Sequence, residues 1–163
     1  MTLATAGDDG TPSSRTVLVK RVDETGLRFG TAQDSRKGRE LSANPRAAGT
    51  FYWRETLQQV NVAGVLELLD EADSDVLFDR RTDESKAATR VSAQSEPLID
   101  PARLKARMKE DLEAGVLVRP AGWRGYRLRI DRIEFWHGSP DRLHRRLEYI
   151  RTGDGWSHRR LQP

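Results

Sequence analysis

The first half of the chain alternates short apolar stretches with turn-forming residues, a pattern typical of β-strands joined by tight turns. Residues 15–22 are β-branched and mostly apolar, and the turn-rich segment at residues 7–12 precedes them. The few apolar residues before that turn are therefore expected to pair with this strand as a hairpin. The same reasoning predicts strands over residues 3–6, 15–22, 26–31, 47–53 and 58–69.

Helical patterns interrupt the strands at three places. In the last of these, Leu104, Met108 and Leu112 recur at i, i+4 and i+8, so they would share one face of a helix. In the first, Asp34 or Ser35 is a suitable N-cap. We expect helices over residues 35–43, 70–81 and 101–114.

Short β-like segments return after Pro120 and continue to the end of the chain. The turn Gly153-Asp154-Gly155 joins the last two as a hairpin. Strands are predicted over residues 125–130, 133–137, 147–151 and 156–161. Many short strands with few helices favour a mainly β fold, an antiparallel β-barrel with peripheral α-helices, over a doubly wound α/β fold. We expect one domain over residues 1–163, because no linker or repeat divides the chain.

Composition restricts the class of protein further. The chain has no cysteine, which excludes disulfides, thiolate metal sites and a cysteine nucleophile, and fits a reducing compartment. No apolar run approaches the roughly 20 residues that a membrane helix needs, so no membrane span is expected. The first residues lack a basic stretch followed by a long apolar run, so we expect no secretory signal and a cytoplasmic location.

Charge and motifs argue against several chemistries. A formal net charge of +3 is a weak argument for nucleic-acid binding, which is not expected. His137, His144 and His158 lack the i, i+4 spacing and the acidic partners of a metal site, so no metal is expected. The chain has no P-loop, no Gly-x-Gly-x-x-Gly and no Gly-x-Ser-x-Gly motif, which leaves nucleotide-motif and hydrolase interpretations without support.

Anion binding is better supported. Ser35-Arg36-Lys37 would combine free backbone N–H groups, a hydroxyl and two cations at a helix N-terminus, which suits a phosphate dianion, although an ordinary solvated helix start has the same pattern. Arg142 and His144 are expected on one face of a strand, where they would form either a ligand contact or a charged rim.

Several motifs occur in an order that is typical of one enzyme family. They are Arg15-Thr16-Val17-Leu18-Val19-Lys20, Ser35-Arg36-Lys37-Gly38-Arg39-Glu40-Leu41, Asn44-Pro45-Arg46, Gln59-Val60, Gln94-Ser95, Trp123-x-Gly125-Tyr126-Arg127, Glu134-Phe135-Trp136-x-Gly138 and Arg142-Leu143-His144-x-Arg146. Across nearly the whole chain they resemble the pyridoxamine 5′-phosphate oxidase family of flavoenzymes. The resemblance implies a split β-barrel homodimer with FMN in clefts shared by both subunits, and a C-terminal dimerisation segment at about residues 120–163.

The same resemblance implies roles residue by residue. The family's FMN contacts match Arg15, Thr16, Val17, Leu18, Lys20, Thr31, Arg36, Lys37, Gln59, Gln94, Ser95, Trp136 and Arg146. Its substrate contacts match Lys20, Arg81, Ser85, Arg142 and His144, of which Arg142 and His144 are the expected catalytic pair. The residue types agree with these roles, since guanidinium and ammonium groups bind phosphate by charge-assisted hydrogen bonds, and glutamine can donate to and accept from a flavin ring edge.

Other positions depart from the usual family pattern and favour one branch of it. Leu77 stands where a tyrosine that binds the substrate phosphate is usual, Gly30 replaces an aromatic residue, and Arg145 replaces an aspartate. The segments at residues 52–59 and 141–149 resemble the phenazine-biosynthesis flavin oxidases. That branch implies a reduced tricyclic phenazine carboxylate as substrate, which has no phosphate for a tyrosine to bind.

The resemblance therefore leads us to expect an FMN-dependent oxidase that removes two electrons from a planar anionic nitrogen heterocycle, with O2 as acceptor and hydrogen peroxide as product. The substrate would stack on the flavin while Arg142 and His144 hold its polar edge. Two alternatives stay open at this point. One is a pyridoxine or pyridoxamine 5′-phosphate oxidase that forms pyridoxal 5′-phosphate, and the other is a barrel that binds flavin or haem without turnover.

Overall fold

One long strand, β7, organises a single antiparallel sheet of nine strands. The computed structural model describes all 163 residues. In chain order the strands are β1 (Thr2–Ala6), β2 (Pro12–Thr16), β3 (Arg21–Asp23), β4 (Gly26–Ala32), β5 (Arg46–Trp53), β6 (Gln58–Leu68), β7 (Trp123–His137), β8 (Arg145–Thr152) and β9 (Gly155–Leu161). The helices are α1 (Arg36–Ala43), α2 (Glu71–Asp79), α3 (Asp83–Val91) and α4 (Pro101–Ala114).

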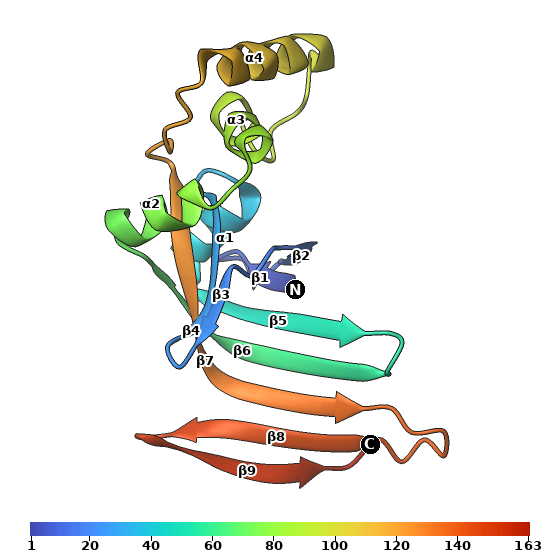
Figure 1. The fold of residues 1–163 in the computed structure, drawn as a ribbon. Coiled ribbons are helices and arrows are strands. Elements are labelled where there is room, and N and C mark those ends of the chain that lie inside the picture. The colour runs from blue at the N-terminus through green and yellow to red at the C-terminus, as the bar shows by residue number, and fades with distance from the viewer.

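Strand β7 joins two parts of the sheet because different strands pair with its two halves. Along one edge, β6 follows β7 over the whole length of β6. Along the other edge, β4 pairs with the first half of β7 and β8 with the second half. A register shift between Ala63 and Gly64 of β6 leaves Asp131 of β7 without a partner on β6. From this bulge, β7 leads away from the helices toward the end of the molecule formed by β8 and β9 (Figure 1).

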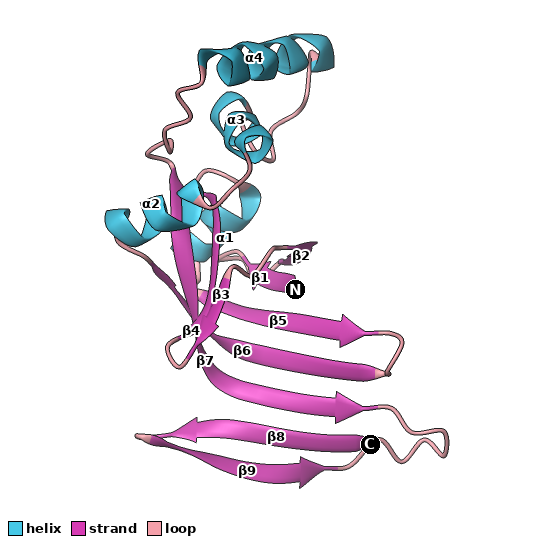
Figure 2. Ribbon diagram, viewed as in Figure 1, coloured by secondary structure: helices cyan, strands magenta, loops and turns pink.

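Two groups of buried side chains hold these elements together. The larger group joins the sheet to α1 through Leu41. In it, Leu3, Phe29 and Leu128 are fully buried, and the Phe29 ring stacks on Tyr126 at 5.8 Å between centroids. The smaller group consists of Leu69, Leu77, Phe78 and Trp123. Helices α3 and α4 pack against each other at the end of the molecule opposite β9, and α4 has no buried residue (Figure 2).

The predicted class, mainly antiparallel β with peripheral helices, is confirmed, but two strand predictions are wrong in detail. Residues 15–22 are not one strand, because this segment changes its pairing partner. The backbone N–H of Val17 donates to the carbonyl of Met1, whereas that of Lys20 donates to the carbonyl of Arg28. The two strands predicted at residues 125–130 and 133–137 are one strand, because pairing with β6 continues on both sides of the bulge.

Helix α3 is an element that the hydrophobic pattern does not predict. Its residues are mostly polar and only Ala87 is buried, so no apolar period marks it. The Thr82 hydroxyl accepts a hydrogen bond from the Ser85 backbone N–H, which is the local N-cap signal for its start. None of the four helices is both long and apolar enough to cross a membrane.

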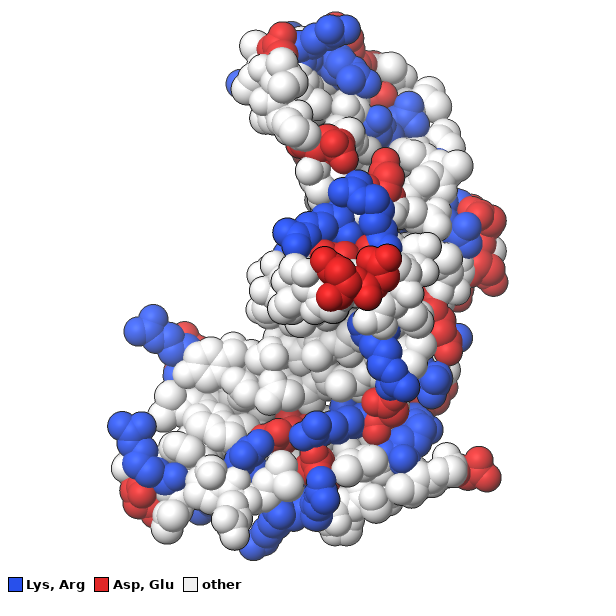
Figure 3. All heavy atoms as spheres, turned by 180° about the vertical axis from the view of Figure 1, so that it is seen from behind, with Lys and Arg blue, Asp and Glu red and all other residues white.

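The molecule is elongated and hollowed on one side. Figure 3 shows the helices at one end and the β8–β9 hairpin at the other. Charged groups gather below the helices, and a broad surface without charged groups lies between them and the hairpin. Phe135 and Trp156 contribute exposed aromatic surface on β7 and β9, being 46% and 39% exposed. A surface of this kind is typical of contact with another molecule.

Candidate functional site

Three cations gather at the N-terminus of α1, and we call Arg15, Arg36 and Lys37 the cationic cluster. Ser35 caps the helix, since its hydroxyl accepts a hydrogen bond from the Gly38 backbone N–H at 3.3 Å. This agrees with the N-cap expected from the sequence. Strand β2 brings Arg15 to the same place, where its side chain and that of Arg36 contact one carboxylate.

Lys37 is the buried member of the cationic cluster. Its ammonium group donates to Thr31 Oγ1 at 2.8 Å, to Gln94 Oε1 at 3.1 Å and to Ser35 Oγ at 3.2 Å. Burial lowers the pKa of Lys37 to about 8, and repulsion from Arg15 adds to this effect. The ammonium uses its three N–H groups on neutral oxygens and forms no ion pair with a carboxylate, so its positive charge can attract an anion.

A short loop after α3 adds two predicted residues to the cluster. The Oγ of Ser95 accepts a hydrogen bond from the Arg36 backbone N–H at 3.1 Å, and Thr31 Oγ1 lies 3.1 Å from Gln94 Oε1. Ser95 has a φ of 80°, a left-handed conformation that is uncommon outside glycine and that often occurs at functional sites. The fold thus joins β4, α1 and this loop into one polar group.

Glu40 is the carboxylate in this group, and it is not among the predicted site residues. It accepts hydrogen bonds from Arg36 Nε at 2.9 Å and from Arg15 Nη2 at 3.2 Å, and also from the hydroxyls of Ser13 and Thr5. Burial raises the pKa of the Glu40 carboxyl, but these hydrogen bonds outweigh burial and lower the pKa to about 2. The i, i+4 spacing of Arg36 and Glu40 on one helix is a sequence signal that could have revealed the pair.

The predicted FMN contacts that follow Arg15 alternate in exposure. Thr16, Leu18 and Lys20 are exposed, whereas Val17 is half-buried against the core. No side-chain hydrogen bond or ion pair joins Thr16 or Lys20 to the cationic cluster. Their side chains are therefore free to meet a ligand, but the chain alone does not bring them onto the cluster.

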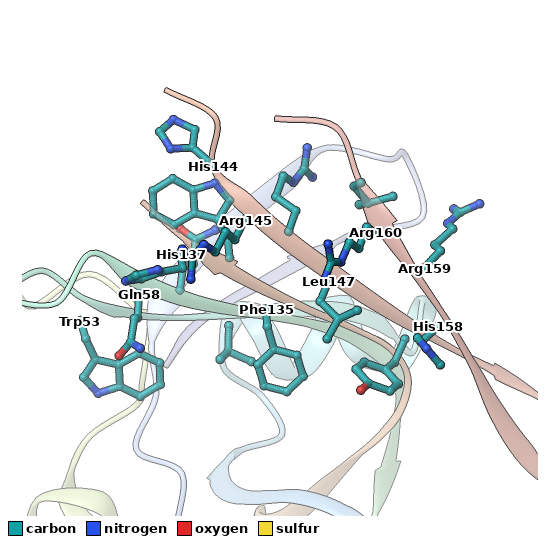
Figure 4. Close-up of a pocket in the computed structure, with 16 residues that line it drawn as sticks. Trp53, Gln58, Phe135, His137, His144, Arg145, Leu147, His158, Arg159 and Arg160 are labelled. Carbon is teal, nitrogen blue, oxygen red and sulfur yellow. The ribbon is translucent and has the colours of Figure 1, made fainter. Parts of the chain in front are cut away.

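A second candidate site is a cavity of about 1170 Å³ along β6, β7, β8 and β9, which we call the aromatic pocket (Figure 4). Four predicted residues line it: Gln59, Trp136, His144 and Arg146. Residues that were not predicted also line it, among them Trp53, Phe135, Tyr149, His158 and Arg160. The hairpin turn at residues 153–155 is the sequence signal that could have indicated His158 and Arg160, because it places β9 beside β8.

Pairing between strands sets three of the predicted side chains in one row. Gln59 of β6 pairs with Trp136 of β7, and Trp136 pairs with Arg146 of β8. Arg146 is held in place, because its Nε donates to Glu134 Oε1 at 2.7 Å and its Nη1 to the carbonyl of Gln162 at 3.1 Å. The row offers an amide, an indole and a guanidinium along one wall of the aromatic pocket.

Arg142 and His144 lie in the loop between β7 and β8, so their expected placement on one face of a strand is wrong. A turn replaces the strand, since the Arg142 N–H donates to the carbonyl of Ser139 and Arg142 has a φ of 67°. His144 Nδ1 accepts a hydrogen bond from the Ser139 N–H at 3.1 Å, which leaves Nε2 to carry the proton of the neutral ring. The His144 ring lies 4.9 Å from Trp136 and lines the pocket, whereas Arg142 is exposed and does not.

Arg81 and Ser85 lie together at the junction of α2 and α3. The Arg81 guanidinium stacks 5.1 Å from the Trp123 ring and donates to the carbonyl of Ser85 at 2.9 Å. It forms no ion pair with a carboxylate, and burial lowers its pKa. Leu77, which stands where the family usually has a tyrosine, is buried and packs with Phe78 and Trp123.

The predicted site residues therefore fall into separate groups within one chain. The cationic cluster contributes no residue to the lining of the aromatic pocket. No hydrogen bond or ion pair connects the cluster with Gln59, Trp136 or Arg146. The strands fix this separation, because α1 packs on β1 while Trp136 lies near the far end of β7.

Two family models together match most of the chain. Residues 1–111 match the family model described as pyridoxamine 5′-phosphate oxidase, and residues 123–163 match the model described as the pyridoxine 5′-phosphate oxidase C-terminal dimerisation region. The chain belongs to the pyridoxamine 5′-phosphate oxidase family. The second match covers β7, β8 and β9, which form most of the aromatic pocket, and it fits a homodimer.

Relatives within the pyridoxamine 5′-phosphate oxidase family carry two kinds of name. A pyridoxine/pyridoxamine 5′-phosphate oxidase of Rubrobacter xylanophilus is 47% identical over all of this chain and 76% of its own length. A dihydrophenazinedicarboxylate synthase of Pseudomonas chlororaphis is 42% identical over all of this chain and 74% of its own length. Sequence identity thus places the chain in the family without choosing between these activities.

Solved structures of the family confirm the fold. PhzG from Burkholderia lata, solved in complex with tetrahydrophenazine-1-carboxylic acid, has a TM-score of 0.96 and 44% identity, over 99% of this chain and 81% of that chain. A pyridoxamine 5′-phosphate oxidase-related, FMN-binding protein from Nostoc punctiforme has a TM-score of 0.79 at 20% identity, over 99% and 86% of the two chains, and shows the shared fold. The predicted split barrel is therefore correct.

Proposed function

We propose that this protein is an FMN-dependent oxidase that acts on a reduced phenazine carboxylate. In the proposed homodimer, each FMN lies between the cationic cluster of one subunit and the aromatic pocket of the other. Membership of the family and the match of residues 123–163 to its dimerisation region support this arrangement. The separation of the two groups within one chain supports it as well, because a second copy can bring them together.

The cationic cluster fits the phosphate of FMN, and this observation carries the cofactor assignment. The Lys37 ammonium, the Arg36 guanidinium and the Ser95 hydroxyl lie at one capped helix N-terminus. Arg36 uses only its Nε in a side-chain hydrogen bond, so both terminal nitrogens are available to phosphate oxygens. Charged side-chain donors of this kind suit a phosphate monoester. The backbone N–H groups of Arg36 and Gly38 already donate to Ser95 and Ser35, so the side chains carry the assignment.

The aromatic pocket fits the flat ring system of a flavin and a planar substrate. Trp136 and the neighbouring Gln59 would meet the ring by stacking and by hydrogen bonds to its polar edge. The chemistry that FMN supplies when bound is removal of two electrons from the substrate as a hydride, with O2 as final acceptor. The substrate loses that hydride and one proton, and O2 gains two electrons and two protons to become hydrogen peroxide.

The side chains contribute orientation and charge to this reaction. Arg142, exposed at the tip of the loop between β7 and β8, would bind a substrate carboxylate by charge-assisted hydrogen bonds. His144 presents Nε2, because Ser139 already occupies Nδ1. This nitrogen would hold the polar edge of the heterocycle beside Trp136. Neither residue needs to act as an acid or base for the hydride to leave.

Leu77 favours a phenazine carboxylate over a vitamin B6 phosphate. Its side chain is buried among Leu69, Phe78 and Trp123, so this position offers no hydroxyl to a substrate phosphate. A relative of the same fold, PhzG, is known in complex with a tetrahydrophenazine carboxylic acid, which agrees with this assignment.

A pyridoxine or pyridoxamine 5′-phosphate oxidase is the second candidate. Arg81 favours it, because this half-buried guanidinium has no carboxylate partner and is therefore available to a phosphate. The relative from Rubrobacter xylanophilus carries that name, and so do proteins of Anaeromyxobacter dehalogenans and Thermosynechococcus vestitus that are 46% and 47% identical to this chain. Exposed Lys20 would add a second cation to such a site.

Peroxide release with each substrate separates the two candidates. We expect the purified protein to form hydrogen peroxide with a reduced phenazine carboxylate and little with pyridoxamine 5′-phosphate. The Arg142→Ala variant should lose about tenfold or more in kcat/KM while retaining its flavin, because one charged hydrogen-bonding partner is removed. Arg107→Ala, an exposed change on α4, is the control. Turnover confined to the B6 phosphate, or normal turnover of Arg142→Ala, would contradict the proposal.

A further inference from the structure

We propose that Glu40 is a positioning residue for cofactor binding, which holds Arg15 and Arg36 in place to receive the FMN phosphate before the cofactor arrives. The inference rests on the proposed function, because it assumes that the cationic cluster is the phosphate site. It concerns a carboxylate that would not touch the cofactor itself. Its role is to fix two arginines and to balance their charge.

The contacts of Glu40 reach both arginines from one buried position. Its side chain is 10% exposed, and its oxygens lie 2.9 Å from Arg36 Nε and 3.2 Å from Arg15 Nη2. The hydroxyl of Ser13 donates to the same carboxylate at 2.6 Å and 2.8 Å. Thr5 donates to it as well. Groups on α1, β1 and β2 thus converge on one carboxylate.

This arrangement orients Arg36 in a particular way. Glu40 holds the Nε of Arg36, and the two terminal nitrogens of the guanidinium have no hydrogen-bond partner. The Arg36 side chain is 57% exposed, so without this anchor it would be free to move in solvent. Fixing a long side chain in advance reduces the entropy lost when a ligand binds. Glu40 therefore orients the guanidinium of Arg36 so that its two terminal nitrogens can donate to two phosphate oxygens.

Glu40 also makes the cationic cluster possible. Arg15, Arg36 and Lys37 would repel one another at this half-buried site, and one carboxylate among them reduces that repulsion. With Glu40 ionised, the group has two net positive charges when Lys37 is protonated. A phosphate monoester carries a charge of about −1.5 to −2 at pH 7. The charges of the prepared site and of the proposed ligand therefore match.

Comparing FMN with riboflavin tests this role, because the two differ only in the phosphate. Flavin-free protein is titrated with each, and binding is followed by quenching of flavin fluorescence. We expect Glu40→Gln to raise the Kd for FMN about tenfold, through loss of a charge-assisted hydrogen bond, and to leave the Kd for riboflavin within about twofold. Glu67→Gln is the matched control, since Glu67 also accepts hydrogen bonds from two arginines, Arg127 and Arg129.

A second variant keeps the test decisive if Glu40→Gln does not fold. Ser13→Ala removes the hydroxyl that donates to Glu40 and accepts from Arg15, so it loosens the contact between the two while leaving all charges in place. We expect it to weaken FMN binding about threefold without affecting riboflavin. Unchanged FMN binding in both soluble variants, equal loss of FMN and riboflavin, or tighter FMN binding by Glu40→Gln would overturn the inference. If the unaltered protein itself does not prefer FMN to riboflavin, the proposed function fails instead.

Discussion

The cationic cluster and the aromatic pocket are built in opposite ways. In the cluster, Lys37 and Glu40 are buried and each charged group has hydrogen-bond partners within the chain. In the pocket, aromatic side chains such as Trp53 and Phe135 remain 47% and 46% exposed. The difference teaches that one chain can arrange the proposed anion-binding half of the site by itself, whereas the proposed ring-binding half needs a further surface to close it.

The largest expected effect comes from Lys37. Lys37→Met keeps most of the side-chain length but removes the charge and the hydrogen bonds that the ammonium donates to Thr31, Ser35 and Gln94. We expect FMN affinity to fall about 100-fold, because the buried positive charge that would attract the phosphate is lost and the charged hydrogen bonds that hold this group of side chains together are broken. Riboflavin affinity should change by no more than about threefold. Isothermal titration calorimetry measures both, with the exposed Lys105→Met as control, and equal losses for the two ligands would contradict the division between cluster and pocket.

Trp136 should show the opposite behaviour. Trp136→Ala removes an aromatic surface from the pocket and no charge from the cluster. Loss of one stacking partner is expected to weaken FMN and riboflavin alike by about tenfold. The same calorimetric titrations apply. If Trp136→Ala weakened FMN binding much more than riboflavin binding, the indole would be acting on the phosphate. That result would contradict the division between the cationic cluster and the aromatic pocket.

A smaller effect is expected from pH. The pKa of Lys37 is lowered to about 8, so in flavin-free protein the ammonium loses its proton as pH rises above that value. A bound phosphate favours the charged form, so binding FMN above pH 8 requires uptake of a proton. The FMN association constant should therefore fall by about fourfold between pH 7 and pH 8.5.

Riboflavin supplies the reference for this pH series, because it has the same ring and no phosphate. Its affinity should stay nearly level between pH 7 and 9.5, and Lys37→Met should abolish the slope for FMN. A slope of the same size for both ligands would assign the titration to the ring or to another part of the protein.

Local sequence signals predicted the cationic cluster better than the aromatic pocket. Ser35 was identifiable as an N-cap from its position before a helical segment, and Arg36 and Lys37 follow directly. Such signals act over one helical turn, so a single sequence carries them. Glu40 also lies within one turn, but its role depends on Arg15 from a distant strand, and the helix pattern alone does not indicate that contact.

Pairing partners that are distant in the chain explain the predictions that failed. Residues 15–22 have the composition of one strand, yet their hydrogen bonds pass from β1 to β4. Residues 142–144 alternate in polarity, but the turn from Ser139 to Arg142 keeps them out of β8. To predict that Gln59, Trp136 and Arg146 lie in one row, the register of three strands must be known. The sequence pattern does not give this register, and the three residues were identified through the positions that match the family.

Mixed dimers test the central claim, that cluster and pocket of different subunits form one flavin site. Lys37→Met and Trp136→Ala subunits carrying different tags are produced together, and the mixed dimer is isolated by both tags. If the claim is correct, one of its two sites contains Lys37 and Trp136 unaltered and the other lacks both. The mixed dimer should then bind one FMN with the affinity of the unaltered protein, although neither parent dimer does. Absence of any site with that affinity would show that each subunit builds its own site and would contradict the account.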